Sequence, residues 1–559
     1  MKNKKTKWLL FFIFLLGAVL RLAWLDKFPA GLTPDEAAQG YSAYSILKTG
    51  KDEWGVKLPL NLRSFGDFKP SLQTYLMIPS VAVLGLTKIA VRLPNALLGS
   101  LAIIGVFYLV WELFKKEGLA LLAAFLLSIS PWHIPLSRGA FEANLTVFFI
   151  SFGAYFLLRS YSSEVARRDS SKCVTKQVLA ALFLGLNMFS YHSAKLMTPL
   201  IILSFAIYYL RFSKIKIKKF IIHHSLFIIL YSLFFIVAFA SFFQGGQTRG
   251  ADIAVFNPTD NWQAVADERW WGAGVGLPDL ISRIFHNKLS YSLSQFSKNY
   301  LSYLSFDFLF INGPGEGTYG MIPGRGVLWW WQLLVLAWVF YQLARKPNKK
   351  ALLVIFLVLF SPLAAALAKG ARAANRVAVM MPWIQILLAW GLWKLKIKSE
   401  KLKILGVFII FIFFLFFLED YFVQSPRKIG KQMLFGRCKA LEWAEAKRAE
   451  QIIVSRKLSE PQAYVMFCLG LEPELVQKET PNWLRYESEG LGFVDQLGEY
   501  CLDKFLFKEI NWASDSLEKN TVLLGVPEEF PSQFKPDEIV FYPNKQAAIF
   551  GYSTDSKQE

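Results

Sequence analysis

The chain has 559 residues, of which 54% are hydrophobic and 16% aromatic, and its formal net charge is +20 at pH 7. This composition lies outside the usual range of water-soluble domains and indicates a membrane protein. The basic residues lie between apolar runs rather than on one face of a soluble domain, which argues against nucleic-acid binding. The four cysteines form no CxxC pair or Cys/His cluster, so they indicate neither a disulfide scaffold nor a zinc-stapled fold.

Eleven apolar runs are long enough to cross the hydrocarbon core as helices. The first follows a lysine-rich N-terminus and is interpreted as a membrane helix rather than a signal peptide, because no clean cleavage site follows it. The runs are predicted at residues 8–25, 92–114, 118–136, 140–160, 178–194, 196–212, 225–243, 327–344, 351–368, 376–394 and 403–420. The sequence therefore predicts a polytopic α-helical protein.

The short basic clusters fix the predicted orientation. Alternating from a cytoplasmic N-terminus places all of them inside, near residues 2–7, 115–116, 167–176, 211–219, 345–350 and 394–403. The protein is thus expected in the inner or plasma membrane with its N-terminus in the cytoplasm. Three large segments then face the extracytoplasmic side, namely the loop 26–91, the loop 244–326 and the tail from about residue 421.

The tail is expected to form a soluble extracytoplasmic α/β domain, 421–559, that follows a transmembrane domain, 1–420. A helical pattern covers Lys439–Glu450, and strand patterns cover Gln451–Ser455, Thr521–Gly525 and Glu538–Tyr542. Cys468 and Cys501 are possible disulfide partners, which would leave Cys438 unpaired.

The first outer loop carries two adjacent acids, Asp35 and Glu36, about ten residues beyond the first predicted span. A carboxylate at this height can meet both a lipid phosphate and an acceptor from the aqueous side, as a general base requires. Thr33-Pro34-Asp35-Glu36 is equally a good helix start, so capping is the alternative. Further along the loop, Lys69 is either a cation for a lipid phosphate or a lysine that extends its head to the interface.

The order of these motifs resembles the polyprenyl-phosphate-sugar glycosyltransferases of the GT-C class, which include protein O-mannosyltransferases and lipid A aminoarabinose transferases. Pro34-Asp35-Glu36 is similar to the acidic motif of their first loop, and Lys69-Pro70-Ser71-Leu72 to their Lys-Pro-Pro-Leu. Further matching segments lie at residues 90–99, 130–142, 191–195, 308–313 and 375–382. The resemblance covers about residues 8–395. It departs at Ala38 and Gln39, where the family often has Arg and Tyr, and at Glu142, where it usually has Asp.

The resemblance implies transfer of a sugar from a polyprenyl-phosphate donor to a hydroxyl of a protein, lipid or glycan, with inversion at the anomeric carbon. Asp35 is the expected base, and Glu36 is expected to orient the acceptor or hold Asp35 in position. The candidate cations for the leaving phosphate are Lys69, Arg138, Lys195 and Arg376. The candidate acceptor or sugar contacts are Glu142, Tyr191 and His192. On a helix, Arg138 and Glu142 would share a face and form an ion pair or part of the acceptor site.

Other readings remain at this point. His133 and His192 fit structural hydrogen bonding better than proton relay or metal binding. The loop 244–326, with its glycine-rich segment 312–320, is a candidate lid or binding loop. No cofactor is expected, although the paired acids could hold a divalent ion. The alternatives in function are a lipid-linked glycan polymerase or ligase and, with less support, a transporter, which would carry charges in mid-span.

Overall fold

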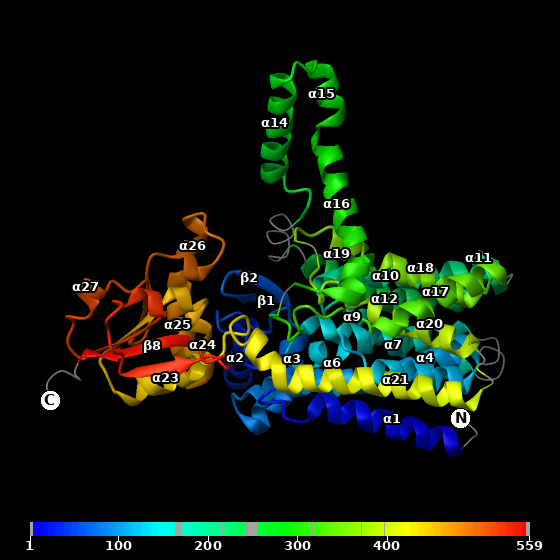
Figure 1. The fold of residues 1–559 in the computed structure, drawn as a ribbon, viewed down its shortest axis with the longest axis horizontal. Coiled ribbons are helices and arrows are strands. Elements are labelled where there is room, and N and C mark those ends of the chain that lie inside the picture. Colours follow the sequence, from blue (N-terminus) through cyan, green and yellow to red (C-terminus); the bar gives the residue numbers. More distant parts are fainter. Residues whose placement is uncertain are drawn as a thin grey trace.

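The computed structural model describes residues 4–161, 170–213, 216–241, 243, 254–315, 317–370, 372–395, 397 and 399–554. Long helices form the body, a smaller α/β unit lies at one end of them, and a helical hairpin projects from the top of the body in Figure 1, across the direction of the long helices.

The body contains helices over all eleven predicted apolar runs. The run 118–136 is divided between two helices, and so is the run 351–368. The body helices are α1 (Lys4–Leu22), α4 (Lys88–Phe114), α5 (Glu117–Ser128), α6 (His133–Arg138), η1 (Glu142–Asn144), α7 (Leu145–Tyr161), α9 (Ser170–Asn187), α10 (His192–Ser213), α11 (Ile217–His223), α12 (Ser225–Ser241), α17 (Trp330–Arg345), α18 (Lys349–Phe360), α19 (Leu363–Ala366), α20 (Met380–Lys394) and α21 (Glu400–Glu419).

Five described helical stretches are long and apolar enough to cross a membrane by themselves. They cover Lys88–Phe114, Glu142–Tyr161, His192–Phe212, Lys349–Ala366 and Glu400–Ile429, and the bent pair α11–α12 could form a sixth span. Several other body helices are shorter, such as the 12-residue α5 and the 15-residue α20. The count of eleven spans therefore stays a prediction.

The first loop folds into α2 (Pro34–Thr49), the antiparallel strands β1 (Asn61–Ser64) and β2 (Asp67–Pro70), and α3 (Leu72–Leu84). The turn between the strands consists of Phe65 and Gly66, both with positive φ (35° and 112°). Two successive residues with positive φ are typical of the tight turns whose twist matches that of the strands.

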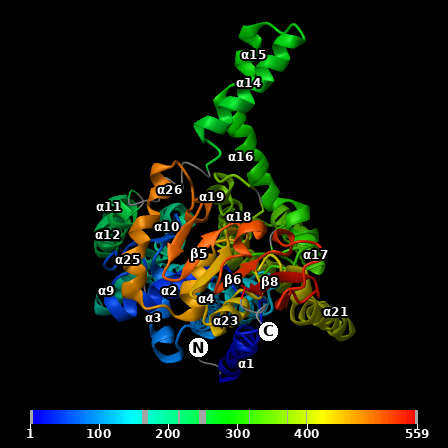
Figure 2. The same ribbon diagram turned by 90° about the vertical axis from the view of Figure 1, so that its left-hand side faces the viewer.

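The C-terminal unit is a six-stranded sheet with strand order β4-β5-β3-β6-β8-β7. The strands β3 (Gln451–Ser455), β6 (Thr521–Gly525) and β7 (Glu538–Phe541) confirm the predicted ones; the others are β4 (Tyr500–Leu502), β5 (Phe505–Lys508) and β8 (Ala547–Ser553). The central strands β5, β3 and β6 are parallel, and the outer pairs are antiparallel. Figure 2 views this unit from the end of the molecule, in front of the body.

Helices accompany this sheet and connect it to the body. They are η4 (Asp420–Gln424), α22 (Ser425–Ile429), α23 (Arg437–Ala446), η5 (Arg456–Leu458), α24 (Pro461–Leu469), α25 (Pro473–Trp483), α26 (Arg485–Ser488), η6 (Val494–Gln496), α27 (Trp512–Asp515) and η7 (Pro527–Glu529). The predicted helix 439–450 corresponds to α23, which begins two residues earlier and ends at Ala446.

The C-terminal unit and the first loop share one hydrophobic core. It joins Ala37 and Tyr41 of α2 to Tyr464 and Phe467 of α24. A Cβ atom on Gly40 would lie 2.8 Å from the Phe467 ring, so the absence of a side chain at residue 40 lets the two helices approach closely. The C-terminal unit is therefore packed directly against the loop that carries the candidate base.

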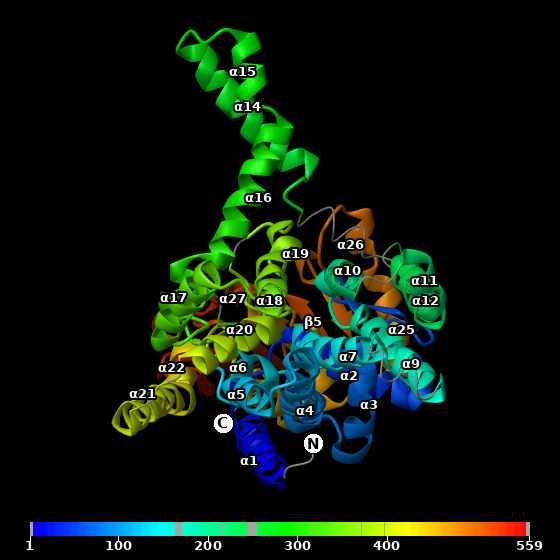
Figure 3. The same ribbon diagram turned by 90° about the vertical axis from the view of Figure 1, so that its right-hand side faces the viewer.

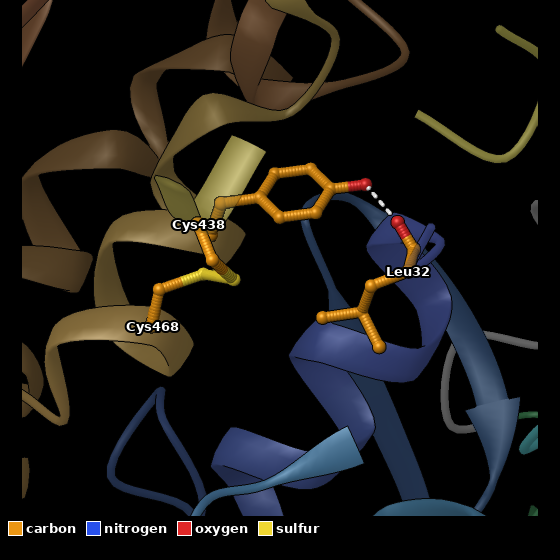
Figure 4. Close-up of a disulfide and its surroundings, with 4 residues drawn as sticks. Leu32, Cys438 and Cys468 are labelled. Atoms are coloured by element: carbon orange, nitrogen blue, oxygen red, sulfur yellow. Dashed lines mark hydrogen bonds between the residues drawn. A yellow bond between two sulfur atoms is a disulfide. The ribbon is translucent and has the colours of Figure 1, made fainter. Parts of the chain in front are cut away.

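The disulfide joins Cys438 of α23 to Cys468 of α24, whose Cα atoms are 5.3 Å apart. The expected Cys468–Cys501 pair is wrong, because α23 packs beside α24 whereas Cys501 lies exposed on β4. Figure 4 shows the disulfide close to Leu32, whose carbonyl oxygen accepts a hydrogen bond from the Tyr464 hydroxyl at 2.7 Å.

Candidate functional site

The first turn of α2 gives its two adjacent acids different surroundings. Thr33 is the N-cap: its hydroxyl accepts a hydrogen bond from the Glu36 amide, and the Glu36 carboxylate accepts one from the Thr33 amide. This capping box confirms the helix start predicted from the sequence. Asp35, one residue earlier, stays partly exposed and points instead to Lys69.

Glu36 is fully buried and forms an ion pair with Arg92 at the start of α4. The Arg92 Nε and Nη2 atoms lie 2.8 and 3.1 Å from the two carboxylate oxygens, and the Ala140 amide donates a further hydrogen bond. Burial alone would raise the pKa of Glu36, but Arg92 and the amides hold it below its ordinary value. Both carboxylate oxygens of Glu36 are occupied, so Glu36 cannot contact an acceptor in this geometry. The geometry fits the other expected role of Glu36, which is to hold Asp35 in position.

Lys69 lies on β2, with its ammonium group paired to the Asp35 carboxylate. The lysine is only 2% exposed and lies over the Phe65 ring, 4.8 Å from its centre. Burial works against its charge, yet Asp35 and Glu142 hold the pKa of Lys69 above its ordinary value. Lys69 therefore stays cationic beside two carboxylates.

Glu142 and Gln39 complete the surroundings of this ion pair. The Gln39 amide nitrogen donates to Glu142 at 3.4 Å, and Glu142 interacts electrostatically with both Lys69 and Asp35. Gln39 is 1% exposed, and its amide oxygen has no hydrogen-bond partner among the described residues. A buried acceptor atom without a partner is costly unless a ligand or water satisfies it.

Tyr191, Asn375 and Arg376 approach the same place from the body. The Asn375 amide donates to the Tyr191 hydroxyl at 3.1 Å, and both Glu142 and Arg376 lie within electrostatic range of that hydroxyl. Arg376 also donates to the carbonyl oxygens of Lys369 and Gly370, at 2.6 and 2.7 Å. The structure thus brings four predicted positions, Asp35, Lys69, Glu142 and Tyr191, into one cluster with Arg376 at its edge.

His192 and Lys195 lie on the first turn of α10, behind the β1–β2 hairpin. A ring nitrogen of His192 is 2.8 Å from the Phe68 carbonyl oxygen, which fits the structural role. Lys195 donates to the Ser241 hydroxyl at 3.1 Å. A groove of about 490 Å³, almost entirely apolar, begins nearby between α3, α9 and α12, and Ser71 lies at its margin.

Arg138 lies away from this cluster. It is fully buried, and its guanidinium donates to the carbonyl oxygens of Leu20, Ala23 and Trp24 at the end of α1. A donor-phosphate role does not fit, because Arg138 is fully buried and both of its terminal nitrogens donate to these carbonyls. The expected shared face with Glu142 is wrong, because α6 ends at Arg138 and a new turn begins at Glu142.

Two elements of the site were not identified from the sequence. The glycine-rich segment brings Tyr319 close to Lys69, and the C-terminal unit brings Glu460, at the start of α24, within electrostatic range of Asp35 and Lys69. Burial raises the pKa of Glu460 to about 7, with Asp495 adding to the effect. Glu460 and its neighbour Ser459 both have positive φ (42° and 55°), an uncommon pair for residues other than glycine. The sequence offers no signal for either contact.

The residues around Asp35 do not resemble a metal site. Among the described residues, no group of three or more His, Cys, Asp or Glu side chains is arranged to hold a metal ion. Lys69 supplies the positive charge beside Asp35, and a divalent ion held by the paired acids stays an untested prediction.

Comparisons with known proteins address the fold. Residues 58–259 match the family model for the N-terminal part of the oligosaccharyl transferase STT3. ArnT from Cupriavidus metallidurans, in the apo state, aligns with 10% identity over 99% of this chain and 98% of that chain, with a TM-score of 0.55. Its structure with undecaprenyl phosphate aligns with 11% identity over 98% of both chains and a TM-score of 0.50. All of these proteins are GT-C glycosyltransferases.

The chain has the GT-C fold. This confirms the predicted class, a polytopic helical membrane protein with a C-terminal sheet unit. The archaeal oligosaccharyltransferase AglB from Archaeoglobus fulgidus, in complex with an inhibitory peptide and a dolichol-phosphate, aligns with 13% identity and a TM-score of 0.48. That alignment covers 84% of this chain, which spans 64% of the length of AglB. A sequence comparison with curated proteins gives no match.

Proposed function

We propose that this GT-C protein transfers a sugar from a polyprenyl-phosphate donor to a hydroxyl acceptor, with inversion at the anomeric carbon and Asp35 as the base. The observation that carries the proposal is the pair of Asp35 and Lys69 at the start of α2. One partner is a partly exposed carboxylate and the other a buried cation that Asp35 and Glu142 keep charged. A single displacement needs a general base for the acceptor and a cation for the phosphate leaving group, and Asp35 and Lys69 are groups of these two kinds.

The reaction is a single displacement. The acceptor hydroxyl gives its proton to the Asp35 carboxylate while its oxygen bonds to the anomeric carbon. The bond from that carbon to the phosphate oxygen breaks, and polyprenyl phosphate leaves as a dianion. Lys69 neutralises the charge that develops on the phosphate. Glu36 and Arg92 do not contact the substrates. Their buried ion pair positions Asp35 by fixing the turn that carries it.

The donor lipid is proposed to lie in the apolar groove between α3, α9 and α12. This groove is open to the surface of the body and reaches Ser71, two residues after Lys69. Lys195, on the first turn of α10, and Arg376 are the further cations available to the phosphate. The acceptor then approaches from the opposite side, where Gln39, Glu142 and Glu460 offer hydrogen-bonding groups.

The site is proposed to face the extracytoplasmic side. The basic clusters belong to the other ends of the spans, and the Cys438–Cys468 disulfide fits an oxidising compartment. Cys501 is exposed on the same unit and serves as a natural reporter. A membrane-impermeant maleimide should label Cys501 in intact cells and should not label a Cys501→Ser variant. Labelling only after the cells are permeabilised would show that the C-terminal unit lies on the cytoplasmic side.

The central experiment compares the protein with Asp35→Asn and with Asp26→Asn, a matched control at an exposed acid of the same loop. Each is reconstituted with labelled polyprenyl-phosphate hexose or pentose and an envelope extract, and free polyprenyl phosphate and labelled product are measured. We expect Asp35→Asn to lower turnover at least about 100-fold and the control to retain it. Equal turnover in both variants would remove Asp35 as the base.

A second candidate is transfer of a preassembled oligosaccharide rather than a single sugar, as by a lipid-linked glycan polymerase or ligase. The match of residues 58–259 to the STT3 family model favours it. The same assay separates the two when lipid-linked oligosaccharides are added to the donor panel. Consumption of oligosaccharide donors alone would support this second candidate, whereas consumption of single-sugar donors supports the first.

A further inference from the structure

A helical hairpin projects from the body next to the candidate site. It consists of α14 (Pro258–Gly274), α15 (Asp279–Phe285) and α16 (Lys288–Leu304). Figures 1 and 3 both show it rising from the body, and in Figure 1 it lies across the direction in which α1 and α21 run. Because α21 belongs to the candidate span Glu400–Ile429, a hairpin across it extends along the plane of the membrane.

The base of the hairpin lies at one end of the candidate span Lys349–Ala366. The Asn299 amide donates to the Ala368 carbonyl oxygen at 2.9 Å, and Tyr303 is fully buried against Phe308. Arg376 holds the adjoining residues 369–370, so this is the end of the spans that carries the candidate site. The hairpin therefore leaves the body at the height of the membrane surface.

At the tip of the hairpin, polar side chains face inward and large apolar side chains face outward, which is the reverse of the arrangement in a water-soluble domain. Polar contacts hold it together: Arg269 donates to the His286 carbonyl oxygen at 2.7 Å, and Glu268 pairs with the His286 ring at 2.8 Å. Large apolar side chains point outward, with Trp270 exposed by 74% and Leu280 by 72%. The other exposed apolar residues of this tip are Trp271, Val275, Ile281, Ile284 and Phe285. So many exposed large apolar side chains within residues 270–285 indicate an interaction surface.

The apolar surface continues from the tip along α16. Leu289, Leu293, Phe296 and Tyr300 recur at intervals of three and four residues, which places them in one narrow stripe. Lys298 and several serines lie on the opposite face of the helix. Leu289 and Leu293 are exposed, so no described element covers this part of the stripe.

We propose that the hairpin is an interfacial element that lies in the leaflet at the site end of the spans, with its tip and the α16 stripe among the acyl chains. A lipid surface fits better than a protein partner because the hairpin runs along the membrane plane and starts beside a membrane span. Its tryptophans and tyrosines are the side chains enriched at membrane interfaces, and an apolar stripe opposite a polar face is typical of interfacial helices.

The test places one fluorescent label at a time on the full-length protein in a Cys501→Ser background. Labels go on Leu280→Cys and Leu293→Cys on the apolar surface and on Lys298→Cys as the matched control on the polar face of α16. The protein is reconstituted in phosphatidylcholine vesicles, and quenching by an acyl-chain spin label is compared with quenching by aqueous iodide. Residues 280, 293 and 298 are all exposed in the folded chain, so the substitutions disturb no packing.

The proposal requires strong acyl-chain quenching at residues 280 and 293 and preferential iodide quenching at residue 298. Iodide quenching at all three positions would overturn it. Shielding of residues 280 and 293 from both quenchers that grows with the protein-to-lipid ratio would overturn it in favour of contact between two copies of the chain.

Discussion

Glu53 offers a quantitative test of how the first loop is packed against the C-terminal unit. Its carboxyl is 2% exposed and has the Ser42 hydroxyl, 3.3 Å away, as its hydrogen-bond donor, while Thr480 of α25 donates to its backbone oxygen at 3.0 Å. Burial, together with neighbouring Asp52, raises the pKa of Glu53 from an ordinary 4.5 to about 8. Folding therefore keeps a proton on this group that the unfolded chain releases.

The sign follows from these two values. Because the folded pKa is the higher one, the stability of the protein falls as pH rises from about 4.5 to about 8 and changes little through this group above that range. The cost is about 1 kcal/mol at pH 5 and about 4 kcal/mol at pH 8. Glu53→Gln keeps the shape of the protonated group and cannot ionise, so it should remove this cost.

The assay is the thermal unfolding midpoint in detergent between pH 5 and pH 9. Glu53→Gln should unfold at a distinctly higher temperature than the unsubstituted protein at pH 8, with a much smaller difference at pH 5. Glu474→Gln, at an exposed acid of α25, is the control and should follow the unsubstituted protein throughout. A Glu53→Gln variant that is less stable at pH 8, or equally stabilised at both pH values, would refute the reasoning.

Three further variants test other contacts. Arg92→Met leaves Glu36 buried without its partner and should destabilise the protein by about 3 to 5 kcal/mol, seen as a lower unfolding midpoint; an unchanged midpoint would contradict the buried ion pair. Replacing Cys438 and Cys468 by serine opens a link between positions 30 residues apart and should cost about 3 to 4 kcal/mol, after which a reducing agent should have no further effect on unfolding. Because the pKa of Glu460 is about 7, Glu460→Gln should flatten the change in KM for the acceptor between pH 6 and pH 8, and an unaltered pH profile would place Glu460 outside the acceptor site.

Local sequence patterns were sufficient to predict those elements whose structure depends on neighbouring residues. The helical segments of the body, the strands at residues 451–455 and 521–525, and the capping box of Thr33 and Glu36 follow from apolar periodicity and capping residues. The resemblance to a known family gave Asp35 and Lys69 their separate expected roles, but their direct pairing was not predicted, since no local pattern relates two residues 34 positions apart.

The wrong predictions concern residues whose surroundings depend on contacts between distant parts of the sequence. Asp35 and Glu36 look alike in the sequence, and only the position of Arg92 assigns Glu36 to the interior. Arg138 is an outer-loop cation by sequence, yet the end of α1 engages its guanidinium. The disulfide partner of Cys468 depends on which helix packs beside α24, which cysteine spacing does not specify.

The packing of the C-terminal unit gives it a structural part in the candidate site. It holds the turn before Lys69, because the Val494 amide donates to the Phe65 carbonyl oxygen at 3.0 Å and a Cβ atom on Gly66 would lie 2.7 Å from the Gly492 carbonyl oxygen. It holds the segment before Asp35 through the hydrogen bond from Tyr464 to Leu32. A short two-stranded hairpin is marginally stable by itself, so these contacts, rather than the hairpin alone, fix where the Lys69 ammonium group meets Asp35.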